Sequence, residues 1–379
     1  MSTSINDDLL QIEEYKLQNP NSFDTPSLLI FEDMLSYNLE EIIKICKSPK
    51  NIVPHIKTHK SLDILKLQIA SGITSFKCAT LKEAELLANS NSGVQEIIIS
   101  YPIIHIQKII RLIKLMKDFP NIKWRTIVST KEHLETLSNF MKNSSLQADV
   151  YMDLDTGMHR TGVEPGDEAV KFFIDAKNYS SINILGIHIF DGQTLYKPNI
   201  EERSSLVKKS IEYMRYIKNE LTKKNITITD NVVGGSWSFH LYLNEPNTRV
   251  SPGTWIYWDS RNATQEELNF KIASVVIGQV IDIDYKRDTI TTDIGSKSIS
   301  PDQPINVRLK LIGQDKAELI AQSEEHGVIK LNGESLNVGD LILAAPGHAC
   351  TTTILYPHSN LIDKKGNFIK KIPHEARDR

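Results

Sequence analysis

Residues 96–118 read EIIISYPIIHIQKIIRLIKLMKD, and this stretch indicates how the chain folds. It starts with a short apolar run that ends at a Tyr-Pro pair, as a buried β-strand does where it meets a loop. Isoleucine and leucine then recur at helical spacing among lysine and arginine, which predicts an amphipathic helix. A strand followed directly by such a helix is the repeating unit of a parallel sheet.

The same pattern of strand and helix continues on both sides of this stretch, from about residue 25 to residue 235. The other predicted strands read SLLIF (27–31), NIVPHIK (51–57), SFKCA (75–79), WRTIVS (124–129), ADVYMDLD (148–155), INILGIHIF (182–190) and ITITDNVVGG (226–235). About eight such units in one sheet call for right-handed crossovers and fit a closed barrel better than an open, doubly wound sheet. We therefore predict a β/α barrel of the TIM type over residues 25–265.

The helical period disappears after about Gln265. Apolar and polar residues then alternate between turn signals, in runs such as FKIASVVIGQVIDIDY (270–285), TITTDI (289–294) and PINVRLKLIGQ (304–314). We predict an all-β domain over residues 266–379, joined by residues 1–24. The expected fold class is α/β, a β/α barrel with a C-terminal all-β domain.

The composition limits the partners of the chain. Its 379 residues are 40% hydrophobic and 24% charged, with a formal net charge of -3, so nothing in the charge favours nucleic acid or an anionic membrane. The first residues, MSTSINDDLLQIEEY, show neither a signal peptide nor a transmembrane segment, and we expect a cytoplasmic protein. Three scattered cysteines make no disulfide framework and no CxxC metal pair. A small molecule is the expected partner.

The loops that follow the strands of a parallel barrel gather at one end, which we call the mouth, and carry the chemistry. NIVPHIKTHKS (51–61) runs from an apolar strand directly into such a loop and places Lys57 at the mouth. A lysine there can form a Schiff base with an aldehyde cofactor and, when desolvated, exchange protons. Most loop lysines are solvated surface charges, so the position alone leaves both interpretations open.

Five motifs occur in order along the chain: PHIKTHK (54–60), CATLKEAE (78–85), DTGMHRTGV (155–163), SEEHG (323–327) and PGHAC (346–350). Together they resemble the D-threonine aldolase and D-serine dehydratase family, which belongs to the alanine-racemase-like enzymes that use pyridoxal 5'-phosphate (PLP). The resemblance extends from about Thr25 to His358. It implies the alanine-racemase-like fold, PLP bound to Lys57, a structural role for Lys60 at a helix start, and a homodimer of chains paired head to tail.

The resemblance also assigns the rest of the cofactor site. Arg160, which follows a glycine-containing turn, would contact the phenolic oxygen of PLP and help to keep it ionised. Glycine-rich loops let backbone N–H groups approach a phosphate closely, and the family binds the PLP phosphate at the stretches VVGGSWS and SPGT. The residues concerned are Gly235, Ser236, Gly253 and Thr254. A surface arginine and ordinary glycine turns are the alternative interpretation.

GIHIFDGQT (186–194) ends a predicted strand with His188 and Phe190 on one face. If that face points inward, Phe190 would lie against the pyridine ring of PLP and His188 would approach its nitrogen. Ordinary core packing is an equal alternative. Gln193 stands where the aldolases commonly carry a histidine, and a neutral amide is no general base at pH 7. We take Gln193 as a candidate for contact with the substrate.

PGHACTTT (346–353) ends a β-run, and a two-residue spacing in a strand would put His348 and Cys350 on one face. Imidazole and thiolate suit zinc, and two protein ligands leave positions open for substrate. An HxC pair alone is more often coincidence. The resemblance implies zinc held by these two residues, as in D-serine dehydratases, whereas the aldolases more often have His and Asp. Manganese and magnesium are the alternative metals.

These parts predict a PLP- and metal-dependent lyase that acts on β-hydroxy D-amino acids such as D-serine or D-threonine. In the favoured reaction the metal polarises the β-hydroxyl, Lys57 acts on the α-proton, and the products are an α-keto acid and ammonia. Retro-aldol cleavage to glycine and an aldehyde uses the same parts and is the alternative. A racemase comes next, and a non-catalytic PLP carrier last.

Overall fold

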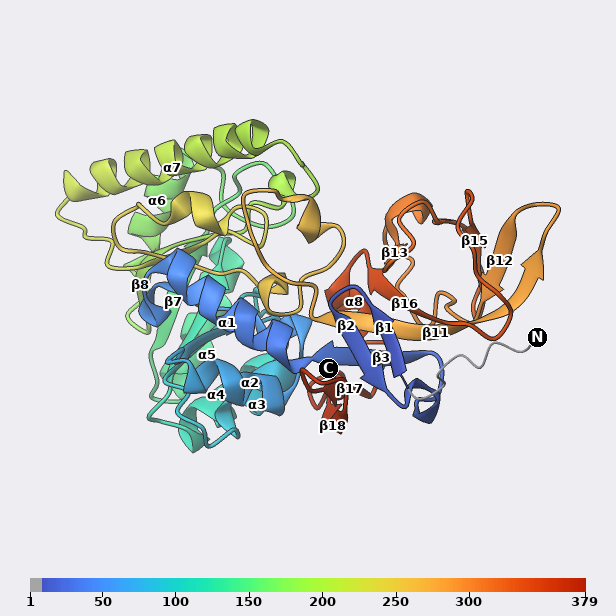
Figure 1. The fold of residues 1–379 in the computed structure, drawn as a ribbon. Helices are drawn as coiled ribbons and strands as arrows, with labels where there is room; N and C mark the ends of the chain where they lie inside the picture. Colours follow the sequence, from blue (N-terminus) through green and yellow to red (C-terminus); the bar gives the residue numbers. More distant parts are fainter. Residues whose placement is uncertain (1–8) are drawn as a thin grey trace. The chain divides into compact units, whose positions relative to one another are not determined.

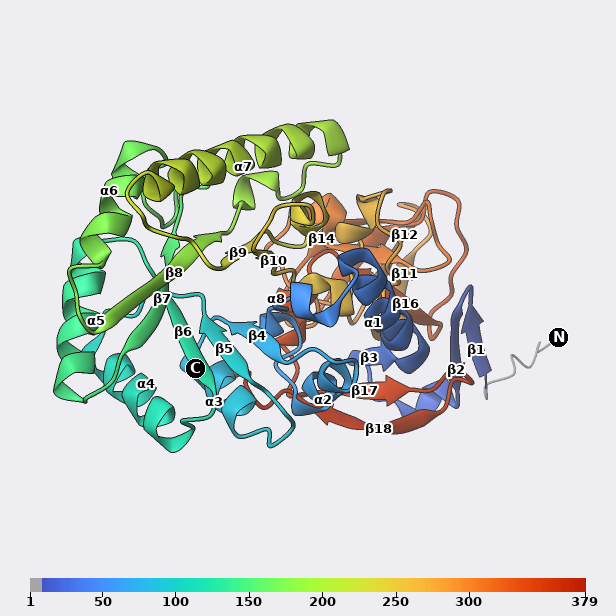
Figure 2. The ribbon, with the colours of Figure 1, turned by 90° about the vertical axis from the view of Figure 1, so that its left-hand side faces the viewer.

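The computed structural model describes residues 9–379, which form two compact units. One unit contains residues 43–253 and the last two residues of the chain, and the other contains residues 9–42 and 254–377. Figure 1 and Figure 2 together label most of the helices and strands of both. The domain limits expected from the sequence, 25–265 and 266–379, stay a prediction.

Parallel strands form the centre of the unit of residues 43–253. One seven-stranded sheet runs in the order β10, β9, β8, β7, β6, β5, β4. Its strands are β4 Ser75–Cys78, β5 Glu96–Ile99, β6 Lys123–Val128, β7 Ala148–Asp153, β8 Ile182–Ile189, β9 Asn231–Val233 and β10 Thr248–Val250. Residues 52–55 close the ring, because Ile52 bridges Val250 and His55 bridges Lys77, both in the parallel sense. The predicted β/α barrel is confirmed.

Two details of the barrel differ from the prediction. SLLIF forms β3, Ser27–Phe31, which pairs with β11 and β17 in the other sheet and is not a barrel strand. A short apolar strand before a helix looks the same in either sheet, so this run was assigned to the wrong partners. The barrel starts instead at residues 52–55 and ends at β10, which is too short to show a period.

Helices follow the strands and cover the outside of the barrel (Figure 2). They are α2 Leu62–Ala70, α3 Leu81–Ala88, α4 Ile106–Asp118, α5 Lys131–Asn143, α6 Asp167–Ala176 and α7 Ile200–Thr222. The side chains of Thr80, Thr130 and Asn199 cap α3, α5 and α7 by accepting a backbone N–H of the first turn. These caps mark where the loops from the mouth enter the helices.

The inside of the barrel is filled, with a different chemistry at each level. One layer is apolar and consists of Val53, Ile98, Ile127, Tyr151 and Val232. Closer to the N-terminal ends of the strands, two arginines meet two carboxylates: Arg249 Nη1 lies 2.6 Å from Glu96 Oε2, and Arg125 Nη1 lies 2.8 Å from Asp230 Oδ2. The charges of this layer are paired with one another, and it closes the end of the barrel opposite the mouth.

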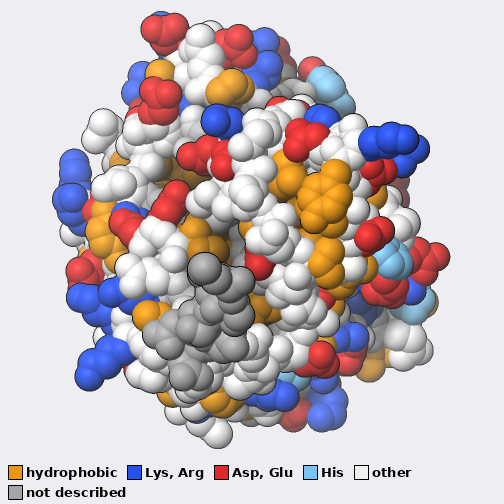
Figure 3. Space-filling model, turned by 45° about the vertical axis from the view of Figure 1, so that its right-hand side comes forward, with side chains coloured by type: hydrophobic (Ala, Val, Ile, Leu, Met, Phe, Trp, Pro, Cys, Tyr) orange, Lys and Arg blue, Asp and Glu red, His pale blue; other side chains and the backbone are white. Residues whose placement is uncertain are grey.

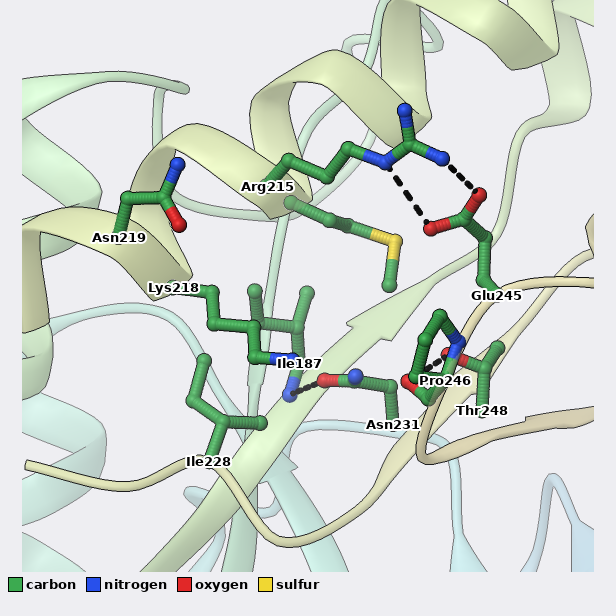
Figure 4. A pocket seen from close by; sticks show the side chains of 10 residues that line it. Ile187, Arg215, Lys218, Asn219, Ile228, Asn231, Glu245, Pro246 and Thr248 are labelled. Atoms are coloured by element: carbon green, nitrogen blue, oxygen red, sulfur yellow. Dashed lines mark hydrogen bonds and ion pairs between the residues drawn. The ribbon is translucent and has the colours of Figure 1, made fainter. Parts of the chain in front are cut away.

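A cavity of about 280 Å³ lies outside the barrel, between α7 and the starts of β9 and β10 (Figure 4). In its lining, Arg215 donates to Glu245 at 2.6 Å, and Asn231 Oδ1 accepts from Ile187 N–H at 3.0 Å. These polar groups are already used within the chain. The cavity also lies at the end of the strands opposite the mouth, where barrel residues serve stability. It is therefore not the candidate active site.

The second unit is built on a mixed, nine-stranded sheet that includes β3 from the N-terminal part of the chain. Its other strands are β11 Ser274–Asp284, β12 Thr289–Thr292, β13 Leu309–Leu311, β14 Glu318–Gln322, β15 Gly327–Lys330, β16 Leu341–Pro346, β17 His358–Ile362 and β18 Phe368–Pro373. The core under this sheet is aliphatic and includes Val276, Ile290 and Ile342. The predicted β-rich C-terminal part is confirmed, with one short helix, α8 Ala349–Thr353, inserted.

The N-terminal part of the chain adds to this unit. A separate hairpin, β1 Leu9–Ile12 and β2 Tyr15–Gln18, precedes β3, and helix α1, Glu32–Cys46, follows β3. Gln18 N–H donates to Gly366 O at 2.8 Å, and Tyr15 Oη donates to Ile272 O at 2.8 Å. Residues 9–24 are therefore bonded to the β-rich unit, whereas residues 1–8 lie outside the described part of the chain.

The face drawn in Figure 3 carries charges of both signs. Lysine and arginine alternate there with aspartate and glutamate, and no single sign dominates. This mixture of signs agrees with the small net charge of -3. Within residues 9–379 no helix is long and apolar enough to cross a membrane.

Candidate active site

Lys57 lies at the mouth of the barrel, in a short 3-10 turn, Ile56–Thr58. The turn starts at His55, whose Nδ1 accepts a hydrogen bond from Lys57 N–H at 3.2 Å. Burial, together with the charges of Lys57 and Lys77, lowers the pKa of His55 well below its usual range. The neutral imidazole is therefore available as an acceptor, and it fixes the backbone of the lysine turn.

The ring of Phe190 brings two predicted residues together. Lys57 Nζ lies 5.7 Å and Arg160 Cζ lies 4.7 Å from the centroid of this ring. Phe190 directly follows β8, whereas Arg160 stands in the loop after β7. The half-buried ring and the two cations over it form what we call the Phe190 platform. Residues from three separate loops therefore meet at one point of the mouth.

Two glycines let further loops approach this platform. A Cβ on Gly235 would lie 3.1 Å from the platform ring, and a Cβ on Gly253 would lie 3.1 Å from Thr58 Oγ1. Gly235 N–H donates to Ser238 Oγ, and Gly253 N–H donates to Ser236 Oγ. The structure thus places the predicted phosphate loops beside the lysine turn, but it engages two of their amides within the chain.

His188 lies inside the barrel near the mouth. It pairs in register with Asp153 of β7, and its Nδ1 lies 2.7 Å from Asp153 Oδ1. Burial lowers the pKa of His188, so the neutral ring donates from Nδ1 and keeps a lone pair on Nε2. No residue from 9 to 379 bonds to this buried Nε2. An unpaired buried acceptor is costly in the chain alone and fits a donor on a bound molecule.

Gln193 lies against the loop after β7. Its Nε2 donates to Thr156 O at 3.0 Å and to Thr156 Oγ1 at 3.1 Å. Its buried Oε1 has no hydrogen-bond partner in the described part of the chain. The amide is therefore fixed, and its free oxygen can accept a hydrogen bond from a ligand but cannot take a proton from one.

Two buried residues at this site, Asp153 and Lys77, were not predicted from the sequence. Asp153 is 4% exposed and also accepts from Thr161 Oγ1 at 2.7 Å, and Lys77 of β4 is 2% exposed. Asp153 had a signal, since it ends a strand within MDLDTGMHR next to the motif that contains Arg160. Lys77 stands in SFKC, which reads as an ordinary strand, and nothing in its neighbours marks it.

The groups at the mouth fit PLP. The amine of Lys57 can bond to its aldehyde, Arg160 offers a permanent charge to an anionic oxygen, and the Phe190 ring offers an aromatic surface. The unpaired Nε2 of His188 can accept from a protonated ring nitrogen. The structure brings these four predicted residues to one end of one barrel.

The second predicted site lies in the β-rich unit. β16 ends at Pro346, His348 stands at the N-cap of α8, and Cys350 lies in the first turn of this helix. The prediction that both side chains share the face of a strand is therefore wrong. A Cβ on Gly347 would lie 1.9 Å from Val307 O. Only glycine allows this approach, and the chain leaves the strand there, before it reaches the histidine.

A carboxylate orients His348. Its Nδ1 lies 2.5 Å from Asp302 Oδ2, and Thr351 Oγ1 donates to Asp302 Oδ1 at 3.1 Å. Burial opposes both charges, but the hydrogen bond between them raises the pKa of His348 to about 11 and lowers the pKa of Asp302 to about 2. A hydrogen bond to Cys350 raises the pKa of His348 further.

This arrangement fits an open metal site. A carboxylate on one ring nitrogen directs the other nitrogen of His348 to a metal, as in many zinc sites. Cys350 supplies a soft donor and lies beside Thr254, with Sγ 3.6 Å from Oγ1. Within residues 9–379 no three His, Cys, Asp or Glu side chains converge as a metal cluster. Two protein donors leave positions for water or substrate, and a metal must displace the proton of the histidine.

Comparison with known proteins addresses both units. Residues 30–261 match the family model for the alanine racemase, N-terminal domain, which covers more than half of the chain. The chain belongs to this alanine racemase family. Residues 273–362 of this family member match a second model, the putative serine dehydratase domain. The combination confirms the resemblance that the five motifs indicated.

The relatives of this chain include aldolases and dehydratases. It is 22% identical to a 3-hydroxy-D-aspartate aldolase of Paracoccus denitrificans over 339 residues, which cover 86% of each chain. It is 23% identical to the D-serine dehydratase of Dictyostelium discoideum, with 92% of this chain and 96% of the other covered. The crystal structure of D-threonine aldolase from Filomicrobium marinum matches with a TM-score of 0.85 at 22% identity, covering 94% and 97%. That match shows a shared fold.

Proposed function

We propose that this chain is a PLP-dependent lyase for D-amino acids with a β-hydroxyl group, and that it dehydrates them to an α-keto acid and ammonia. The observation that carries the proposal is the meeting of Lys57 and Arg160 over the Phe190 ring at the mouth of the barrel. Similar chains are named as D-amino acid aldolases and dehydratases. Those names support a lyase over a racemase or a non-catalytic PLP carrier.

Each residue at the mouth has a part in this chemistry. PLP, when bound, supplies an aldehyde for attachment and a ring that makes the α-proton of an attached amino acid acidic. Lys57 would hold PLP, and its Nζ would carry the α-proton. Arg160 stabilises an anionic oxygen with its permanent charge. His188 would accept from the ring nitrogen, and Asp153 keeps the imidazole in the tautomer that can do so.

We propose further that His348 and Cys350 hold a divalent metal, with zinc favoured by the sulfur donor. Such a metal supplies Lewis acidity to the β-hydroxyl, because hydroxide is a poor leaving group. Asp302 would orient the histidine for this task. Manganese and magnesium are the alternatives, and the hard oxygen ligands that they prefer are absent from the pair itself.

Gln193 bears on the choice between the two lyase reactions. Retro-aldol cleavage requires a base for the hydroxyl proton, and the fixed amide of Gln193 is not one. Dehydration needs no base at that position, so the amide favours the dehydratase over the aldolase. A homodimer and a cytoplasmic location belong to the same proposal and rest on the resemblance and on the sequence.

Product analysis tests the proposed reaction. The full chain is loaded with PLP and incubated with D-serine, D-threonine or D-alanine, with and without a chelator. We expect α-keto acid and ammonia from the two hydroxylated substrates, no change in D-alanine, and loss of turnover after chelation. Glycine and an aldehyde from D-threonine would identify the aldolase instead. Conversion of D-alanine to its L-isomer despite chelation would identify a racemase.

The role of Lys57 is tested by absorbance. Lys57→Ala should lose the visible band that lysine-bound PLP gives, while Lys66→Ala, an exposed lysine on α2, should keep it. Lys60 is a poor control, because its amine pairs with the buried carboxylate of Glu83. An unchanged visible band in Lys57→Ala would refute the assignment.

A further inference from the structure

Lys77 is a second lysine inside the barrel. It pairs in register with Ile98, a member of the apolar interior layer, and it bridges His55. Residues in register on neighbouring strands point to the same face of a sheet, so Lys77 points inward. It is 2% exposed, although lysine is among the residues least often buried.

The amine of Lys77 has no partner in the described chain. Its backbone N–H donates to Pro54 O at 2.9 Å, but Nζ forms no hydrogen bond or ion pair with any residue from 9 to 379. Lys60, which is also buried, pairs with Glu83. A buried ammonium without an acceptor is costly, so the stability of the fold does not explain a lysine at position 77.

Lys77 lies next to the lysine turn at the mouth, because it bridges His55, whose Nδ1 accepts from Lys57 N–H. The charges that act most strongly on its amine belong to Lys57, Asp153, Arg160 and Asp191. None of these four belongs to the paired layer at the opposite end of the barrel. Asp153 is bonded to His188, and Asp191 accepts from Ser238 Oγ at 2.7 Å and Tyr242 Oη at 2.9 Å. Both carboxylates are thus already engaged within the chain.

We propose that Lys77 is a second amine of the ligand site, and that its Nζ donates to an anionic oxygen of the molecule bound at the Phe190 platform. The inference rests on the proposed function, in which that molecule is PLP, with anionic oxygens on its ring and its phosphate. Lys57 is used for attachment, and Arg160 is exposed to solvent. A buried amine makes the stronger bond, because the dielectric constant around it is low.

The state of the amine in the chain alone agrees with this role. Burial, aided by the charge of Lys57, lowers the pKa of Lys77 to about 7. An anion at the mouth reverses part of that effect, because an opposite charge nearby favours the protonated form. Binding of an anionic ligand would therefore both protonate the amine of Lys77 and provide it with a hydrogen-bond acceptor.

Binding of PLP to Lys77→Met tests the inference, because methionine keeps the length of the side chain and removes the amine. The dissociation constant is measured on the full chain from the visible band of lysine-bound PLP. We expect it to rise by roughly 10- to 100-fold, the effect of losing one hydrogen bond to a charged group. Lys77→Gln keeps a hydrogen-bond donor without the charge, so its dissociation constant for PLP should lie between those of the unaltered chain and Lys77→Met. It also serves as a second variant if Lys77→Met does not fold.

Two further ligands identify the oxygen that Lys77 contacts. Weaker binding of inorganic phosphate to Lys77→Met would assign the phosphate, and weaker binding of pyridoxal, which lacks the phosphate, would assign the ring oxygen. Lys123→Met, exposed at the start of β6, is the matched control and should bind PLP normally. Unchanged affinity and an unchanged visible spectrum in both Lys77 variants would overturn this inference alone. An unaltered chain that gives no visible band with PLP would overturn the proposed function with it.

Discussion

Replacing Lys77 by methionine should stabilise the ligand-free chain, which is unusual for a buried polar residue. The amine has a pKa of 10.5 when exposed and about 7 in the folded chain. At about 1.4 kcal/mol for each pKa unit, this difference costs the folded state up to about 5 kcal/mol at low pH. Water that reaches the amine reduces the cost, so about 5 kcal/mol is an upper bound for the gain in the free energy of unfolding.

The gain should depend on pH with a defined sign. Between pH 7 and 10.5 the unfolded chain binds a proton at Lys77 that the folded chain does not, so the stability of the unaltered chain rises with pH in this window. The free-energy cost of burying the Lys77 amine has its full value below pH 7, falls to about 2 kcal/mol at pH 9 and vanishes above pH 10.5. Lys77→Met lacks this dependence, so its advantage over the unaltered chain should be largest at pH 6 and clearly smaller at pH 9.

Calorimetric unfolding of the PLP-free proteins at pH 6 and pH 9 measures this difference. For a unit of this size each kcal/mol moves Tm by roughly 2 to 4 °C, so an advantage of even 2 kcal/mol is visible. Lys60→Met is the contrasting variant, because it leaves the buried carboxylate of Glu83 unpaired and should cost roughly 3 to 5 kcal/mol. A lower Tm for Lys77→Met at both pH values, or an advantage that does not shrink at pH 9, would refute the reasoning.

Three further predictions concern the other parts of the site. Arg160→Ala should still bind PLP and should change Tm little, because the residue is exposed, but it should lose turnover. Full turnover would show that Arg160 is a surface residue without a part in the reaction. Asp302→Asn should weaken the metal roughly 10- to 100-fold in competition with a chelator, because His348 loses its orienting carboxylate; unchanged affinity would remove Asp302 from the metal site. Cys350→Asp should keep the visible band of PLP. Because it exchanges a soft sulfur donor for a hard oxygen donor, it should bind manganese or magnesium in preference to zinc and shift the products towards glycine and aldehyde. A retained preference for zinc would argue against Cys350 as a ligand.

Periodicity predicted the barrel because most of its units combine a strand with a helix long enough to show a period. It failed for SLLIF, since a strand of five apolar residues carries no information about which sheet it joins, and β3 joins the β-rich one. It also missed β10, where three residues pair with β9 between two turns. The pairing of strands that are 200 residues or more apart depends on tertiary packing, which the local sequence pattern does not encode.

The candidate site was predictable where a residue stands in a loop motif. Lys57, Arg160 and Phe190 each follow a strand, and the geometry of a parallel barrel alone brings strand ends together. The metal pair shows the limit of this argument. His348 and Cys350 were placed on a strand because the apolar run of β16 continues up to Pro346, but the close approach of Gly347 to Val307 O ends the strand there.

Lys77 shows why a lysine buried inside a barrel is hard to predict from the sequence. Alternation assumes a strand with one dry face and one wet face, which would put the lysine of SFKC in water and its neighbours Phe76 and Cys78 in the core. In a barrel covered by helices both faces are dry, and all three of these residues are at most 2% exposed. Phe76 and Cys78 then face the helices, and the lysine is left inside the barrel. A charged residue in a strand that is buried on both faces is largely removed from solvent, so a partner from another residue or a ligand would stabilise it. For Lys77 the described chain provides no such residue.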